Sequence, residues 1–178
     1  MSSDSCAELI ASENRRWQAA MAQDFAPSPG NGRFELTTFL EGKSRAWGIF
    51  EDRFGRMRRR FTVEMVGRWQ GEVFLLEETF RYDDGEMDER LWRVVPDADG
   101  RFHATCDDCV GRAEGSCDAD SIRMQYKFRL KFPGRDLIVR FDDRIYRMTE
   151  STAVNRATMS KWGIRLGELS LFFERMND

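Results

Sequence analysis

The segment that decides the fold is Phe74–Val94. It reads Phe-Leu-Leu-Glu-Glu-Thr-Phe-Arg-Tyr, then Asp-Asp-Gly at 83–85, then Glu-Met-Asp-Glu-Arg-Leu-Trp-Arg-Val. Two alternating runs on either side of an Asp-Asp-Gly turn are typical of a β-hairpin. A three-residue loop with Gly85 in the left-handed conformation places Leu76 and Phe74 opposite apolar residues and Glu78 opposite Arg90. A two-residue loop would place the carboxylate of Glu78 opposite Leu91. We therefore predict the first register, with three facing pairs: Glu78 with Arg90, Leu76 with Trp92, and Phe74 with Val94.

Alternating segments continue along most of the chain. The clearest is Ile122–Phe132, in which apolar and aromatic residues alternate with Arg, Gln and Lys, so one face packs in a core and the other meets water. Residues Gly67–Gly71 indicate a break between strands. The predicted strands are Phe34–Leu40, Ala46–Arg53, Arg56–Met65, Phe74–Tyr82, Glu86–Val94, Arg101–Cys106, Val110–Cys117, Ile122–Phe132, Leu137–Met148, Thr152–Met159 and Arg165–Glu174.

This spacing predicts an all-β, antiparallel fold of about ten strands, either a sandwich or a barrel. The short connections favour up-and-down neighbours over a Greek key. Before the strands, Ser5–Glu8 has the spacing of a capping box and precedes apolar residues at helical intervals. We predict an N-terminal α-helix and linker over residues 1–30 and one barrel domain over residues 31–178. The helix either covers one end of the barrel or binds a membrane surface or a partner.

Composition excludes several classes of function. The chain has 178 residues, 41% hydrophobic and 33% charged, with a net charge of -3. This balance gives no reason to expect nucleic acid or an anionic membrane as a partner. No signal peptide, phosphate-binding loop or apolar run of about 18 residues is evident, so we expect a cytoplasmic protein without a cofactor or a transmembrane segment. Reduced thiols are expected for the same reason.

Five polar residues fall on strand faces that are otherwise apolar: Arg59, Glu78, Arg90, Asp143 and Asn155. A buried charge must pair, reach water or hold a ligand. One interpretation is an internal network that fixes the strand register; the other is the polar floor of a ligand cavity, where Arg binds an anionic head group. Adjacent carboxylates on a strand point to opposite faces, so pairs such as Asp142-Asp143 do not form a catalytic dyad.

His103, Cys106, Cys109 and Cys117 have the spacing H-x2-C-x2-C-x7-C. Zinc accepts Cys and His in a tetrahedral set, so a zinc-stabilised structural domain is one alternative. Small buried residues at strand positions are the other. Near the C-terminus, Arg156 and Lys161 either bracket an anionic ligand at the barrel mouth or form a solvated corner.

A set of motifs runs through the strand region in a fixed order. They are Ala46-Trp-Gly-Ile-Phe-Glu-Asp-Arg-Phe-Gly55 with Arg59-Arg-Phe61, Leu76-x-Glu78-x-Phe80-x-Tyr82-x-Asp84-Gly85, Arg90-x-Trp92, Asp107-Asp108-x-x-Gly111-x-Ala113-x-Gly115, Phe141-Asp-Asp143, and Asn155-Arg-Ala-Thr-Met-Ser-Lys-Trp-Gly163 with Gly167-Glu168. Together they resemble a bacterial family known as domain of unknown function 3833, whose members are often described as lipoproteins. The resemblance implies a lipocalin-like, calycin-type barrel and no particular activity.

The chain departs from this family at three places. It lacks the lipoprotein signal of many members, Cys106 and Cys109 replace aliphatic or small residues, and Arg144 replaces a Trp after Phe-Asp-Asp. We therefore expect a non-enzymatic, lipocalin-like binder of a small apolar or lipid-like ligand, with an enzyme in the same cavity or the zinc-stabilised domain as alternatives. The ligand-binding residues predicted are Arg59, Glu78, Arg90, Trp92, Tyr126, Phe128, Asp143 and Asn155.

Overall fold

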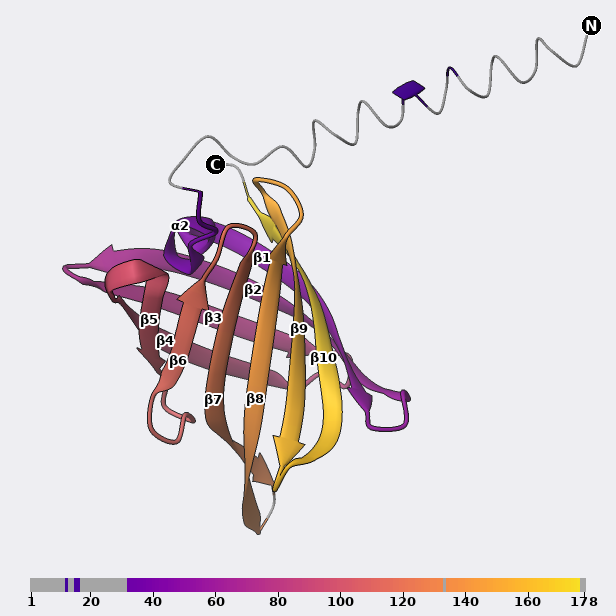
Figure 1. Cartoon of the computed structure of the whole chain (residues 1–178). Coiled ribbons are helices and arrows are strands. Elements are labelled where there is room, and N and C mark those ends of the chain that lie inside the picture. Colours follow the sequence, from indigo (N-terminus) through magenta and orange to yellow (C-terminus); the bar gives the residue numbers. More distant parts are fainter. Residues whose placement is uncertain (1–11, 13–14, 17–31, 133, 177–178) are drawn as a thin grey trace, which may run out of the picture. The chain divides into compact units, whose positions relative to one another are not determined.

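Ten antiparallel strands close into one barrel (Figure 1). The structure is a computed structural model, and it describes residues 12, 15–16, 32–132 and 134–176. The elements are α2 (Leu36–Leu40), β1 (Gly42–Asp52), β2 (Met57–Gln70), β3 (Val73–Tyr82), β4 (Met87–Pro96), the 3-10 turn η1 (Ala98–Gly100), β5 (Arg101–Thr105), β6 (Ala113–Cys117), β7 (Ser121–Phe132), β8 (Arg135–Arg147), β9 (Thr152–Lys161) and β10 (Ile164–Arg175).

Each strand pairs with the strand before and after it in the sequence, and β1 pairs with β10 to close the barrel. Closure leaves no free sheet edge. The prediction of an all-β, antiparallel, up-and-down barrel of about ten strands is therefore confirmed. No helix among the described residues is long and apolar enough to cross a membrane.

The hairpin of β3 and β4 has the predicted register. Glu78 pairs with Arg90, Leu76 with Trp92, and Phe74 with Val94. The amide of Tyr82 donates to the carbonyl of Glu86 at 2.9 Å, which leaves a three-residue loop. Gly85 in this loop has φ 86°, a conformation that glycine adopts without steric cost.

The two ends of the barrel differ. Helix α2 lies at the end where β1 begins, and Phe39 and Leu40 are buried there in the core. The opposite end carries the β1–β2, β3–β4, β5–β6, β7–β8 and β9–β10 connections. Between the ends, inward side chains of all ten strands form the core, while the outward faces are rich in Arg, Asp and Glu.

Two predicted elements are wrong. Residues Phe34–Leu40 are not a strand, because Leu36, Phe39 and Leu40 recur at helical spacing and bury one helical face. Residues Gly67–Gly71 are not a break, because β2 continues to Gln70 and turns only at Gly71. Gly67 instead allows the backbone of Leu40 to approach, since a Cβ at this position would overlap the Leu40 carbonyl oxygen.

The predicted N-terminal helix falls almost entirely outside the described residues. Only Ser12, Arg15 and Arg16 of that segment are described, and all three are helical. The barrel described above belongs to the unit Asn31–Asp178. The division at residue 30 and the role of the helix stay predictions.

Candidate ligand-binding site

The side chains at the middle of the barrel interior are not completely buried. Glu78 and Arg90 face the barrel axis, yet their side chains stay 14% and 17% exposed. Tyr126 also faces the axis and is only partly buried. At the α2 end, by contrast, Phe74 and Ala153 are both 0% exposed. The interior around Glu78 is therefore packed less completely than the α2 end.

One polar cluster forms around Glu78. The indole Nε1 of Trp92 donates to Glu78 Oε2 at 3.1 Å, and Arg90 Nη1 lies 3.8 Å from the same oxygen. Arg90 Nη2 lies 3.4 Å from Asp88 Oδ2. Burial raises the pKa of the Glu78 carboxyl, while the charge of Arg90 and the indole of Trp92 oppose the shift. The positive charge of Arg90 is therefore already shared between two carboxylates.

The guanidinium of Arg90 is also held between two rings. It lies 4.7 Å from the centroid of Phe80 and 4.5 Å from that of Phe128. Such cation–π contacts fix the side chain in the apolar interior. Its Nε is buried and has no hydrogen-bond partner among the described residues.

A second polar cluster lies on β7, β8 and β9. The Tyr126 hydroxyl donates to Asp143 Oδ2 at 3.4 Å, and the Asn155 side chain also hydrogen bonds to this carboxyl. Burial raises the pKa of Asp143 to about 7, although both hydrogen bonds lower it. No ion pair joins Asp143 to a cation within the described residues. Its charge is therefore the least compensated in the interior.

This second cluster has an excess of acceptors. Asp143 and Asn155 are 6% and 5% exposed. Among the described residues, neither Asp143 Oδ1 nor Asn155 Oδ1 accepts a hydrogen bond. Buried acceptors are normally satisfied, so this pair accepts a donor from the proton of Asp143 itself, from water or from a bound molecule.

Aromatic rings connect the two clusters. The ring centroids of Trp92 and Tyr126 are 5.2 Å apart, and those of Tyr126 and Phe141 are 5.3 Å apart. Phe128 contacts Tyr126 edge to face at 6.2 Å. The predicted wall residues Trp92, Tyr126 and Phe128 thus lie together, next to both polar clusters.

The structure brings most of the predicted polar residues together in the interior, with Glu78 beside Arg90 as predicted, and places Arg59 apart from them. Glu78, Arg90, Asp143 and Asn155 face the interior as predicted. Arg59 lies nearer the rim, where it binds Asp84 at 2.7 Å and also Glu86, and stacks 3.6 Å from the Tyr82 ring. Its two carboxylate partners belong to the β3–β4 turn, so the prediction that Arg59 serves the interior site lacks a contact in support.

Sequence reasoning missed two hollows on the outside of the barrel wall. One, of about 630 Å³, is mainly apolar and includes Trp47, Ile49 and Phe172. The other, of about 480 Å³, is polar and includes Arg140, Arg144 and Glu168. Trp47 and Phe172 are apolar residues at outward strand positions of the sequence. Their presence there could have predicted the apolar hollow.

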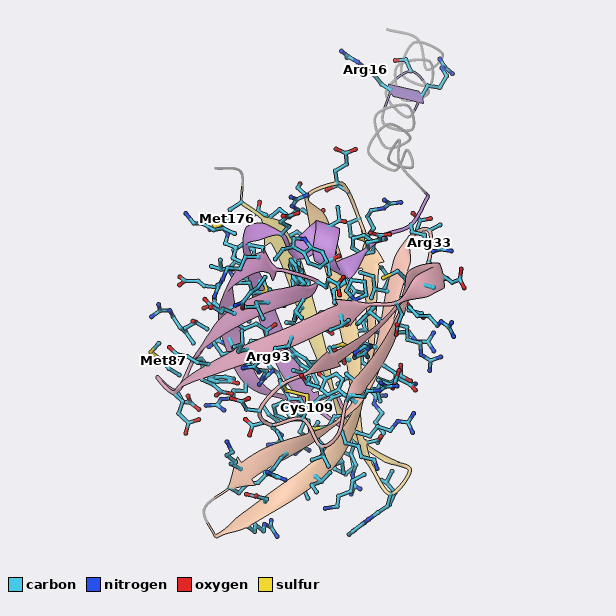
Figure 2. The ribbon with its side chains drawn as sticks, turned by 90° about the vertical axis from the view of Figure 1, so that its left-hand side faces the viewer. Arg16, Arg33, Met87, Arg93, Cys109 and Met176 are labelled. Atoms are coloured by element: carbon cyan, nitrogen blue, oxygen red, sulfur yellow. A yellow bond between two sulfur atoms is a disulfide. The ribbon has the colours of Figure 1, made fainter. Side chains whose placement is uncertain are left out.

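The four candidate zinc ligands are not gathered. Cys106 and Cys109 form a disulfide in the β5–β6 connection, which contradicts the expectation of reduced thiols (Figure 2). His103 Nδ1 lies 3.3 Å from Asp97 Oδ2, and Cys117 is free and buried. No three His, Cys, Asp or Glu side chains cluster as a metal site within the described part of the chain.

Arg156 and Lys161 do not bracket one site. Arg156 Nη2 binds Glu168 at 2.6 Å on the outside of the wall. Lys161 instead lies over the ring of Trp162, with Nζ 4.6 Å from its centroid. Arg156 is therefore part of the outer surface of the wall, and Lys161 is part of the β9–β10 turn.

A closed antiparallel meander with an incompletely packed, partly polar interior defines the chain as a lipocalin-like β-barrel. The chain belongs to the family described as "Protein of unknown function (DUF3833)", whose model matches residues 17–175. The resemblance found in the sequence is thereby confirmed. No curated protein matches this sequence.

Two solved structures are similar to this chain to different degrees. The S-type phycobiliprotein lyase CPES from Guillardia theta superposes with a TM-score of 0.60 at 10% identity, covering 83% of this chain and 96% of the lyase. The redesigned barrel mFAP1 bound to DFHBI superposes with a TM-score of 0.41 at 11% identity, covering 80% of this chain and 100% of the other. At 10% identity, the likeness to the lyase shows the fold alone.

Proposed function

We propose that this barrel is a non-enzymatic binding protein for a small, largely apolar molecule whose polar end donates a hydrogen bond. The observation that carries the proposal is the pair of unsatisfied buried acceptors, Asp143 Oδ1 and Asn155 Oδ1, in an interior that is not completely packed. A hydroxyl or amide placed there supplies a donor. The rings of Trp92, Tyr126 and Phe128 supply the apolar contact.

The charges of the interior favour a donor over an anionic head group. Arg90 already faces Glu78 and Asp88, and Arg59 is bound to the β3–β4 turn. An anion entering near Asp143 would meet carboxylates that have no spare cation nearby. Like charges at close range disfavour binding, so the polar end of the ligand is neutral or cationic.

An enzyme working in the same cavity is the second candidate, and one observation favours it. A carboxyl with a pKa of about 7 is suited to accept and return a proton near neutral pH. The incomplete burial of the interior side chains argues against it, because such chemistry is usually screened from water. We therefore rank binding first.

Two ligands of equal chain length test the proposal. Decanol carries a donor and decanoate carries a negative charge, so isothermal titration at pH 8 should detect decanol and much weaker decanoate binding. The Asp143→Leu variant should bind decanol about tenfold more weakly, because a hydrogen bond to a charged acceptor is lost.

Asp142→Leu is the matched control, since Asp142 is adjacent but faces outward, where it binds Arg123. This variant should bind decanol as the unmodified chain does. Preference for decanoate, or equal loss in both variants, would contradict the proposal.

A further inference from the structure

Large apolar side chains are exposed on two turns at the barrel end opposite α2. Trp162 and Ile164, at the β9–β10 turn, are 88% and 56% exposed, and Phe54, at the β1–β2 turn, is 71% exposed. Single exposed apolar residues are common, but three on neighbouring turns are not explained by packing.

The backbone of Trp162 makes its exposure more informative. Trp162 has φ 52° and Gly163 has φ 78°, and Lys161 pairs with Ile164 across them. Two left-handed residues make the tight turn that Asn-Gly or Gly-Gly usually forms. A tryptophan here takes an unfavourable conformation without gaining burial within its own chain. A partner outside the described residues would explain its presence.

Cations accompany each exposed ring. The guanidinium of Arg53 lies 4.7 Å from the centroid of Phe54, as Lys161 lies over Trp162. Neither Arg53, Arg56 nor Lys161 forms an ion pair within the described residues. The basic side chains of these turns are therefore available to an anion.

Most carboxylates on β1 and β10 next to these two turns are paired with arginines. Asp52 is bound to Arg58, and Glu168 is bound to Arg156 and Arg165. Glu51 is the remaining carboxylate on these strand ends. The local charge of the two turns is thus positive, although the whole chain has a net charge of -3.

The two turns are neighbours around the barrel. Strand β1 pairs with β10, so the β1–β2 and β9–β10 turns follow one another on the same end of the wall (Figure 1). The β3–β4 turn, which carries Asp83, Asp84 and Glu86, follows the β1–β2 turn on its other side because β2 pairs with β3, and its three carboxylates are bound to Arg59 and Arg60 of β2. Met87 follows that turn at the left edge of the molecule, away from the turn of β7 and β8 at the lower end (Figure 2).

We propose that these two turns bind the surface of an anionic phospholipid bilayer. The contact residues form what we call the basic aromatic rim: Arg53, Phe54, Arg56, Lys161, Trp162 and Ile164. Tryptophan and flanking basic residues favour the interface between headgroups and acyl chains, and cations add attraction to anionic lipid. The inference stands apart from ligand binding in the interior.

Co-sedimentation of the full chain with vesicles tests this inference. We expect binding to vesicles of equimolar phosphatidylcholine and phosphatidylglycerol that weakens with added salt, and much weaker binding to phosphatidylcholine alone. Trp162→Asn should lower the affinity about tenfold. The double variant Arg53→Gln, Lys161→Gln should lower it by more than about tenfold, since each charge contributes about fivefold.

The controls separate the rim from other surfaces. Met87→Asn, on the acidic turn, should bind like the unmodified chain. Trp162→Asn should keep or raise the thermal midpoint, because Asn accepts a left-handed conformation. Failure of the unmodified chain to bind the mixed vesicles would overturn the inference, as would equal binding of phosphatidylcholine alone. Unchanged binding by both rim variants would place the contact elsewhere and would also overturn it.

Discussion

Glu78 and Asp143 are both carboxyls of the barrel interior, and they are stabilised by different neighbours. Glu78 has the charge of Arg90 and the indole of Trp92 beside it, whereas Asp143 has only the neutral donors Tyr126 and Asn155. Ionisation of Asp143 is therefore the more costly of the two. Its charge state links ligand binding, stability and pH.

Asp143 should make the protein less stable as the pH rises through neutrality. Its pKa is raised from 3.8 to about 7 in the folded chain, so the folded state holds a proton that the unfolded state has lost. This contribution falls as the pH rises from about 4 to 7 and is constant above. Between pH 5 and pH 8 it is about 2–3 kcal/mol. In the Asp143→Asn variant, urea unfolding should show a free energy of unfolding that lacks this decrease between pH 5 and pH 8.

Asp142→Asn is the control for this pH effect. The Arg123 side chain lowers the pKa of Asp142, so Asp142 is ionised at both pH 5 and pH 8. Its exchange should change the free energy of unfolding equally at the two pH values. A pH dependence of Asp143→Asn identical to that of the unmodified chain would show that Asp143 is not the titrating group.

Arg90 should be required for stability because it faces a buried carboxylate. Arg90→Met leaves Glu78 without its cation, and we expect a loss of about 3–5 kcal/mol in the free energy of unfolding. Adding Glu78→Gln should restore most of it, since the uncompensated charge is removed. Arg93→Met, an outward residue of the same strand, should cost no more than about 0.5 kcal/mol. Denaturant titration of the four proteins makes the comparison, and equal losses for Arg90 and Arg93 would contradict the role.

The inward polar residues could be predicted from the sequence because strand alternation fixes which face a side chain occupies. Their partners could not. Arg59 reaches Asp84 and Glu86 of a turn that is distant in the sequence, and this depends on how the turn folds back. The exposure of Trp162 also escaped prediction, since turn chemistry favours small polar residues at its position.

At the scale of elements, a strong turn motif was predictable and a short helix was not. The Asp-Asp-Gly loop sets the β3–β4 register by itself, so the pairing followed from local sequence. The segment Leu-Thr-Thr-Phe-Leu of α2 suits a strand by its β-branched residues and a helix by its apolar spacing. Contact with the end of the barrel decides between strand and helix. The residues that make this contact are distant in the sequence, so the segment by itself does not predict it.

Gly67 should be essential for seating α2. A side chain at this position would overlap the Leu40 carbonyl and approach the Phe74 ring. Gly67→Ala should therefore lower the free energy of unfolding by about 1–3 kcal/mol, which thermal or urea unfolding will detect. Gly71→Asn is the control, because Gly71 has φ 61° and open space around it. A Gly67→Ala variant as stable as Gly71→Asn would show that α2 is not packed as described.

At the scale of the molecule, the sequence predicts the number and order of strands but not the state of the interior. A chain with 14 Phe and 5 Trp is compatible with a filled or an accessible barrel. The answer depends on how many rings pack against one another and how many remain apart. The incomplete burial of Glu78, Arg90 and Tyr126 favours an interior that the side chains do not fill completely.

The indole N–H signals of a ¹⁵N-labelled sample test the central claim, that the barrel interior binds a small apolar molecule. The described tryptophans report on separate places: Trp92 on the middle of the interior, Trp47 on the outer apolar hollow, Trp162 on the basic aromatic rim and Trp69 on the α2 end of the barrel, where its ring packs against Phe74. Titration with decanol should shift the Trp92 signal, whose N–H donates to Glu78, and leave those of Trp47 and Trp69 in place. A shift of Trp47 with Trp92 unmoved would place the ligand outside the barrel and contradict the claim.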